Sequence, residues 1–146
     1  MYVVVSSSDS KAYYKDNKAT RFRVKLSKPI DLGGGDWYVG VCDIHMSDNA
    51  ENKGVLGLNA DICNGLISDG MQTHLLRKFN CKRNVHVAFP IIYYLPVGKL
   101  FIDTMEFYLT EELGKDVSLD AATKLEVTLH FVQDVSPLRT RHGRLD

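Results

Sequence analysis

The segment KLEVTLHFV, residues 124–132, indicates which fold class this chain adopts. Apolar and polar residues alternate along all of it, and the apolar row consists of Leu125, Val127, Leu129 and Phe131. Successive side chains of a β-strand point to opposite faces, whereas the pattern of a helix repeats about every 3.6 residues. The segment therefore predicts a strand with one buried face and one face toward solvent.

The same two-residue period recurs along most of the chain. We expect further strands at residues 2–5, 22–26, 37–44, 84–89, 91–95, 100–110 and 117–119, with a weaker candidate at 55–63. Two predicted rows can be checked directly. The first places Trp37, Val39 and Val41 on one face and Ile44 on the other, and the second consists of Phe101, Asp103, Met105, Phe107 and Leu109. Residues 72–79 suit either a helical turn or a strand.

Turn-forming residues separate these candidates. They include Pro29, the run Gly33-Gly34-Gly35-Asp36, the polar residues 47–54 and 65–70, and Pro90. The result is about eight to ten short strands with turns roughly every 8 to 12 residues. This pattern predicts an all-β fold, an antiparallel β-sandwich of Greek-key or single jelly-roll type.

Length and charge fit one globular unit. The chain has 146 residues, of which 45% are hydrophobic and 25% charged, which is ordinary for a soluble domain. We expect a single β-sandwich domain over residues 1–137 and a basic, flexible tail over residues 138–146. Lys plus Arg equals Asp plus Glu, 18 each, so no overall field attracts nucleic acid or an anionic membrane, and copies of the chain repel one another little.

The cysteines and the N-terminal residues indicate the cellular compartment in which the chain is made. Cys42, Cys63 and Cys81 are odd in number and lack CxxC spacing, which predicts reduced, buried thiols. The N-terminal residues do not resemble a signal peptide, and no apolar run approaches the ~20 residues of a membrane span. We therefore expect synthesis in a reducing cytoplasm or nucleus.

No motif of enzyme chemistry stands out. The glycine run at residues 33–35 precedes a predicted strand rather than a helix, so it reads as a turn and not as a phosphate loop. Cys42 and His45 lie three apart on a predicted strand and should diverge, although Cys63 or Cys81 could complete a metal site with one of them. His130 reads as a half-exposed strand histidine. We therefore expect no catalytic residues, no cofactor and no metal.

Aromatic and basic residues offer candidate assembly contacts. Tyr13 and Tyr14, like Tyr93 and Tyr94, are adjacent, and on a strand each pair would place one ring inward and one outward. Outward tyrosines suit protein interfaces, although packing explains them as well. In the tail, Arg139, Arg141 and Arg144 form a basic cluster, which is either a disordered end or an arm that docks on a neighbour or touches nucleic acid.

Several segments resemble, in the same order, a virion structural protein of Polinton/Maverick-type elements and adintoviruses. At the start these are residues 1–8, YKDN at 14–17, FRVKLSKPIDL at 22–32 and GDWYVGVCDI at 35–44. They are followed by NADIC at 59–63 with LLR at 75–77, YLPV at 94–97, FIDT at 101–104, residues 114–117 and VTLHF at 127–131. The chain departs from the family at His45-Met46-Ser47, where a Tyr-Pro and an aromatic pair are expected, and its middle is shorter.

This resemblance implies a non-enzymatic role in a virion. The chain is expected to be a minor capsid or penton-like subunit that self-associates symmetrically in an icosahedral shell, with itself and other capsid proteins as partners. The alternative is a cement protein or a surface, receptor-binding sandwich. Residues 1–20 and 138–146 are expected to be arms that become ordered only in the assembly.

Overall fold

The computed structural model describes residues 1–47, 53–65, 67–82, 86–111 and 115–134, and the regular structure of these residues is entirely β. The strands are β1 (Tyr2–Ser6), β2 (Arg21–Asp31), β3 (Asp36–Met46), β4 (Gly54–Ala60), β5 (Ile67–Ser68), β6 (Met71–Gln72), β7 (Leu75–Cys81), β8 (His86–Ala88), β9 (Leu95–Pro96), β10 (Phe101–Glu111) and β11 (Leu125–Asp134).

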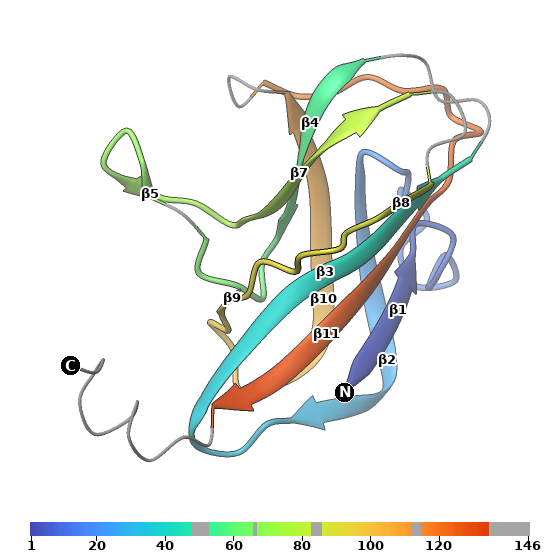
Figure 1. The fold of residues 1–146 in the computed structure, drawn as a ribbon. Coiled ribbons are helices and arrows are strands. Elements are labelled where there is room, and N and C mark those ends of the chain that lie inside the picture. The colour runs from blue at the N-terminus through green and yellow to red at the C-terminus, as the bar shows by residue number, and fades with distance from the viewer. Residues whose placement is uncertain (48–52, 66, 83–85, 112–114, 135–146) are drawn as a thin grey trace.

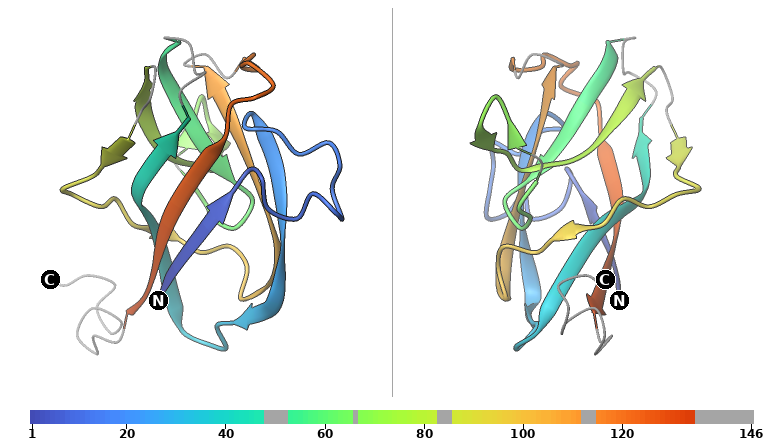
Figure 2. Two further views of the ribbon diagram at one scale, coloured as in Figure 1. Left: turned by 90° about the vertical axis from the view of Figure 1, so that its right-hand side faces the viewer. Right: turned by 60° about the vertical axis from the view of Figure 1, so that its left-hand side comes forward.

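Two antiparallel sheets face each other (Figure 1). Sheet A has the order β1-β11-β3-β8, and β9 also pairs with β3. Sheet B has the order β2-β10-β4-β7, while β5 and β6 form a separate small hairpin that projects from the side of the sandwich (Figures 1 and 2). The predicted antiparallel β-sandwich is confirmed.

One hydrophobic core fills the space between the sheets. Its largest buried side chains come from both layers, including Phe131 and Ile44 from sheet A and Phe22 and Phe107 from sheet B. The rings of Phe22 and Phe107 stack with centroids 5.2 Å apart across the β2–β10 pair. Burying each such side chain contributes about 1.5–3 kcal/mol relative to leaving it in water, so this core holds the two sheets together.

The strand patterns that alternate most regularly in the sequence do so in the structure. Leu125, Val127, Leu129 and Phe131 are all buried, as the period of residues 124–132 predicts. Phe22 and Val24 are likewise buried in β2. The ambiguous residues 72–79 contribute to a strand, β7, which turns Leu76, Phe79 and Cys81 toward the core.

Two predicted rows are wrong at one end each, where the strand register shifts. Within the rest of these rows, Val39 and Val41 in β3 and Met105, Phe107 and Leu109 in β10 are buried in alternation as predicted. Between its pairings with Thr128 and Leu129, β3 gains one residue, Cys42. An extra residue reverses the alternation beyond it, so Ile44 is buried on the same face as Val39 and Val41. A register shift between Ile102 and Thr104 has the same effect in β10: Ile102 enters the core, while Phe101 is exposed and Asp103 is only half-buried.

Three further expectations also need correction. Residues 65–70 hold part of the β5–β6 hairpin, whose Asp69-Gly70 turn has two positive φ angles, 51° and 74°, as a tight hairpin turn requires. Residues 91–94 form no strand, and β9 covers only Leu95–Pro96. Residues 117–119 also form no strand; Val117 is buried without one.

The N-terminal residues belong to the sandwich. β1 pairs with β11 over its whole length, and Val5 is fully buried. Residues 7–20 fold back against β2 through a series of turns, with Asn17 and Ala19 buried. The predicted N-terminal arm is therefore wrong, because β1 completes sheet A within the same chain.

Candidate assembly surface

The turns that follow β1 position the tyrosines singled out in the sequence. The backbone N–H groups of Tyr13 and Tyr14 both donate to the carbonyl of Ser10, at 3.0 and 2.9 Å, and Ser10 itself has a positive φ of 58°. Tyr13 is 71% exposed, Tyr14 is half-buried, and their ring centroids lie 6.4 Å apart. The strand geometry expected for this pair is wrong, but an outward tyrosine is present.

Side chains of this segment cover the outer edge of β2. The Asn17 amide donates to the Arg23 carbonyl at 2.7 Å, and the Arg23 N–H donates to Asn17 Oδ1 at 2.9 Å. The Lys25 N–H donates to Ser10 Oγ at 2.8 Å, and Lys18 and Arg21 exchange backbone hydrogen bonds of 3.1 and 3.0 Å. These contacts occupy the backbone groups that an incoming strand would need.

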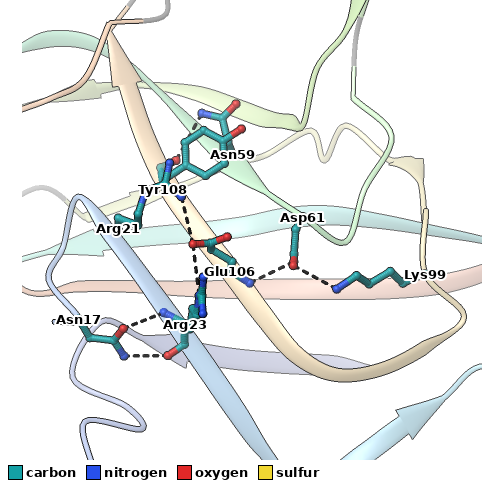
Figure 3. A network of polar contacts seen from close by, with 8 residues as sticks. All are labelled: Asn17, Arg21, Arg23, Asn59, Asp61, Lys99, Glu106 and Tyr108. Atoms are coloured by element: carbon teal, nitrogen blue, oxygen red, sulfur yellow. Dashed lines mark hydrogen bonds and ion pairs between the residues drawn. The ribbon is translucent and has the colours of Figure 1, made fainter. Parts of the chain in front are cut away.

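A groove of about 700 Å³ lies between this segment and sheet B. Arg21 and Arg23 emerge on the same face of β2, and both contact one carboxylate oxygen, Glu106 Oε2, at 3.0 and 3.4 Å (Figure 3). The Arg21 guanidinium also lies 4.6 Å from the centroid of the Tyr108 ring. Since both arginine side chains are more than half exposed, each ion pair contributes at most about 1 kcal/mol.

The groove carries more positive than negative charge. Its lining includes four cationic side chains but only two carboxylates, Asp16 and Glu106. The cations are Lys15, Lys18, Arg21 and Arg23. With one carboxylate shared between two guanidinium groups, several N–H donors remain directed at solvent, so the arrangement suits an anionic group on a partner. Sequence reasoning missed these arginines, although their alternation in RFR was visible.

Partly buried polar contacts hold the backbone of Glu106 in place. Asp61 Oδ1 accepts from the Glu106 backbone N–H at 3.0 Å, and Asp61 Oδ2 accepts from Lys99 Nζ at 3.1 Å (Figure 3). The buried Asn59 amide donates to the Tyr108 carbonyl at 3.3 Å. Burial raises the pKa of Tyr108, and Arg21 opposes that rise. The floor of the groove is thus built on strands rather than on loops.

A second exposed feature lies on the outer face of sheet A. Tyr2 stacks on His130, with ring centroids 4.3 Å apart and an interplanar angle of 21°. Tyr94 reaches His130 from the other side, its hydroxyl 2.8 Å from Nδ1. Tyr2 is 68% exposed and its neighbour on this face, Val4, 57%. Tyr2, Val4, Tyr94 and His130 form what we call the aromatic face.

His130 was predicted as a half-exposed strand histidine, and that prediction is confirmed. Its pKa is lowered, chiefly because burial disfavours the imidazolium and secondarily because the N-terminal ammonium lies close. A neutral imidazole accepts one hydrogen bond and donates another, which suits the contact with the Tyr94 hydroxyl. Among the described residues, the groups that surround His130 are the rings of Tyr2 and Tyr94 and the N-terminal ammonium.

Arg77 holds the chain between β8 and β9 against the body. Its guanidinium lies 4.0 Å from the Phe89 ring centroid and 3.8 Å from that of Tyr93, and Nη1 donates to the Ile91 carbonyl at 2.9 Å. Tyr93 and Tyr94 are both exposed, so the predicted inward ring is wrong for this pair too. They lie off the strands, where residue alternation does not apply.

The three cysteines are thiols, as predicted. Cys63 and Cys81 are buried as expected, whereas Cys42 is only half-buried. Burial raises the pKa of all three thiols, that of Cys63 to about 12, so they lack thiolate character at neutral pH. The sequence did not predict that His45 and His86 pair across β3 and β8, with ring centroids 5.3 Å apart. Within the described ranges, no three side chains of His, Cys, Asp or Glu gather as metal ligands would.

The remaining candidate contacts, Arg139, Arg141 and Arg144, lie outside the described residues, as does the rest of the tail. Across the part of the chain that the structure covers, no helix has the length and hydrophobicity to cross a bilayer.

The chain matches no protein-family model, and a search of curated proteins finds none that is significantly similar in sequence.

Proposed function

We propose that this chain is a structural subunit of a virus particle, a single jelly roll that associates with copies of itself. One observation carries the proposal: the strands of the sandwich pair in nested order along the chain. β1 pairs with β11, β2 with β10, β3 with β8 and β9, and β4 with β7. This is the order expected when a long hairpin rolls up into two sheets, and the resulting jelly roll is typical of viral capsid proteins, lectins and cupins.

The exposed surface supports a role in assembly. The aromatic face places large apolar side chains where a monomer would expose them to water, and contiguous exposure of this kind often marks an interaction surface. The ordered resemblance to a virion structural protein favours a minor capsid or penton-like subunit of an icosahedral shell. Its partners would be itself and other capsid proteins, with nucleic acid reached only through the arginines of the tail. In this role the chain is not an enzyme.

Oligomeric state tests the proposal. The purified full chain should form a closed oligomer, a pentamer for a penton-like subunit, when measured by size-exclusion chromatography with light scattering and by electron microscopy. Antibodies against the chain should label intact particles. A chain that stays monomeric up to millimolar concentration and is absent from particles would refute the proposal.

The groove favours a second candidate, a surface module of the same virion. Its excess positive charge and its tyrosines suit an acidic glycan, because guanidinium groups bind carboxylates or sulfates and rings stack on sugars. A heparin-derived oligosaccharide would serve as probe in calorimetry. Binding that Arg21→Gln with Arg23→Gln abolishes, and that Lys78→Gln on β7 leaves intact, would favour this candidate. The absence of binding would remove it.

A further inference from the structure

The free edge of β1 has backbone groups without partners. Met1 and Phe131 exchange two backbone hydrogen bonds, of 3.2 and 2.8 Å, and the Ser7 N–H donates to the Leu125 carbonyl at 2.8 Å. Hydrogen-bonded pairs alternate along an antiparallel ladder, so the odd residues of β1 bond to β11. The N–H and C=O groups of Tyr2 and Val4 therefore point away from sheet A.

These two residues are the open part of the edge. The next even residue, Ser6, is already engaged, because its N–H donates to Asp9 Oδ2 and its carbonyl accepts from the Asp9 N–H, both at 2.9 Å. For Tyr2 and Val4, no backbone contact beyond the pairing with β11 is recorded among residues 1–47 and the other described ranges. Two donors and two acceptors are thus available in a row.

The side chains of β1 include no charge or proline that would block pairing with a second strand. Residues 2–8 read YVVVSSS and carry no charge and no proline, the usual devices that block an edge. Tyr2 and Val4 are exposed, and they belong to the aromatic face. β-Branched and aromatic residues across from one another stabilise antiparallel pairs, so a strand of this same composition fits the edge best.

We propose that β1 pairs antiparallel with β1 of a second copy, which joins the two A sheets into one. The register follows from the free groups: Tyr2 pairs with Val4 of the second copy, Val4 with its Tyr2, and the two-fold axis passes between the two Val3 residues. Four backbone hydrogen bonds form, and both aromatic faces become continuous. The equal numbers of acidic and basic residues, 18 each, leave no net repulsion between the copies. The inference specifies one contact of the self-association proposed above and so rests on it.

Substitutions at Val4 test the pairing. Val4→Pro removes the free N–H without touching the bonds to β11, and Val4→Lys places two like charges near the axis; each should weaken dimerisation about tenfold or more in sedimentation equilibrium. Val4→Thr is the matched control, because it keeps both the N–H and the β-branched shape. A thermal melt of each variant checks that it folds. Equal association of all four proteins would overturn the inference.

Amide hydrogen exchange and crosslinking test the register. The Tyr2 and Val4 amides should gain protection as concentration rises, while those of Val3 and Val5 stay protected throughout. Val3→Cys should form a dimer disulfide, because facing residues in a non-hydrogen-bonded pair lie ~4.5 Å apart at Cα, whereas Ser8→Cys and the wild-type chain should not.

The outcomes separate this inference from the proposed function. An oligomer whose Tyr2 and Val4 amides stay unprotected overturns the β1 contact and leaves self-association standing. A β1 dimer in a chain that is absent from particles supports the contact and refutes the virion role. Protection that arises only when another capsid protein is added overturns the second copy as occupant. A chain that is monomeric at every concentration refutes both.

Discussion

β1 and β2 are edge strands of the two sheets, but only the edge of β2 is covered by other residues. β2 exposes basic side chains, and the backbone groups of Arg21, Arg23 and Lys25 along its edge are engaged by residues 10–18. β1 exposes Tyr2 and Val4, and their edge-facing backbone groups have no described partner. Both edges lie where the blue segments of Figures 1 and 2 gather.

The difference between the two edges arises from the segment that connects β1 to β2. The segment between β1 and β2 crosses from sheet A to sheet B. The side chains of Ser10 and Asn17 bond to the backbone of β2, whereas that of Asp9 bonds to Ser6 at the end of β1. Natural sheets usually protect their edges because unpaired strands aggregate. Because Asn17 and Ser10 cover the edge of β2 while the uncharged edge of β1 stays open, β1 is the more favourable of these two edges for strand addition.

The largest effect is expected when the cover of β2 is removed. Asn17→Ala deletes the amide that binds the backbone of Asp9 and Arg23 with three hydrogen bonds. Because Asn17 is buried, the Arg23 N–H and the Asp9 and Arg23 carbonyls would lose their hydrogen-bond partner. This loss should lower the free energy of unfolding by about 2–3 kcal/mol. Chemical denaturation measures this loss.

The contrast between the two edges would not hold if the contacts of Asn17 with β2 added nothing to stability. Asn80→Ala, at an exposed position on β7, is the control and should stay within about 0.5 kcal/mol of the wild type. An Asn17→Ala protein as stable as this control would mean that β2 needs no cover. Light scattering should also show that Asn17→Ala aggregates at concentrations where the control does not.

The next largest effect concerns the segment before β9, which packs on sheet A at Gly40. A Cβ on Gly40 would lie 2.4 Å from Ile92 Cγ2 and 2.9 Å from the Tyr93 carbonyl, so Gly40→Ala must push the segment before β9 off sheet A. We expect a loss of about 1–2 kcal/mol and, by NMR, a weakened contact between Tyr94 and His130. Gly34→Ala, where a Cβ meets nothing within 4 Å, is the control, and equal stability of the two variants would contradict this packing.

The sequence predicts the layers well and the details of the site poorly. Rows such as Leu125 to Phe131 follow from alternation alone, because an uninterrupted strand has a fixed period. Cys42 and Ile102 mark where that reasoning fails: a bulge depends on the partner strand and has no local signature. Ile44 was therefore assigned to the wrong face.

The edges could not be derived from the sequence for a related reason. Asn17 and Ser10 look like ordinary turn residues, and only the tertiary fold places them beside Arg23 and Lys25. One outward ring in the Tyr13-Tyr14 pair was predicted, although from a strand that the structure does not contain. The shared contact of Arg21 and Arg23 with Glu106 joins residues more than eighty positions apart. Contacts of this range depend on strand order, which composition does not set.

A smaller change should widen the open edge. Asp9→Ala removes the acceptor of the Ser6 N–H but keeps the backbone N–H that bonds to the Ser6 carbonyl. The open edge of β1 therefore gains one N–H donor, at a cost of about 1 kcal/mol. The Ser6 amide should then exchange as fast as that of Val4 in hydrogen-exchange experiments on the monomer. Asp9→Asn, which keeps a carbonyl acceptor, should leave the Ser6 amide protected; if both variants behave alike, Asp9 does not limit the edge.

The smallest effect is a pH dependence at the aromatic face. Burial and the N-terminal ammonium lower the pKa of His130 below its usual 6.5, so the folded state prefers the neutral ring. The stability that this preference contributes is present above pH 6.5 and is lost as the pH falls through the lowered folded-state pKa. Unfolding of the wild type should become easier between about pH 7 and pH 5, and His130→Gln should show less of this change. Because His130 lies between Tyr2 and Tyr94, its protonation should loosen the N-terminal end of β1 first, which NMR would detect as faster exchange of the Val3 amide in acid. A Val3 amide that exchanges at the same rate at both pH values, after correction for intrinsic exchange, would show that His130 does not stabilise β1, which would then depend on its hydrogen bonds to β11 and on the burial of Val5.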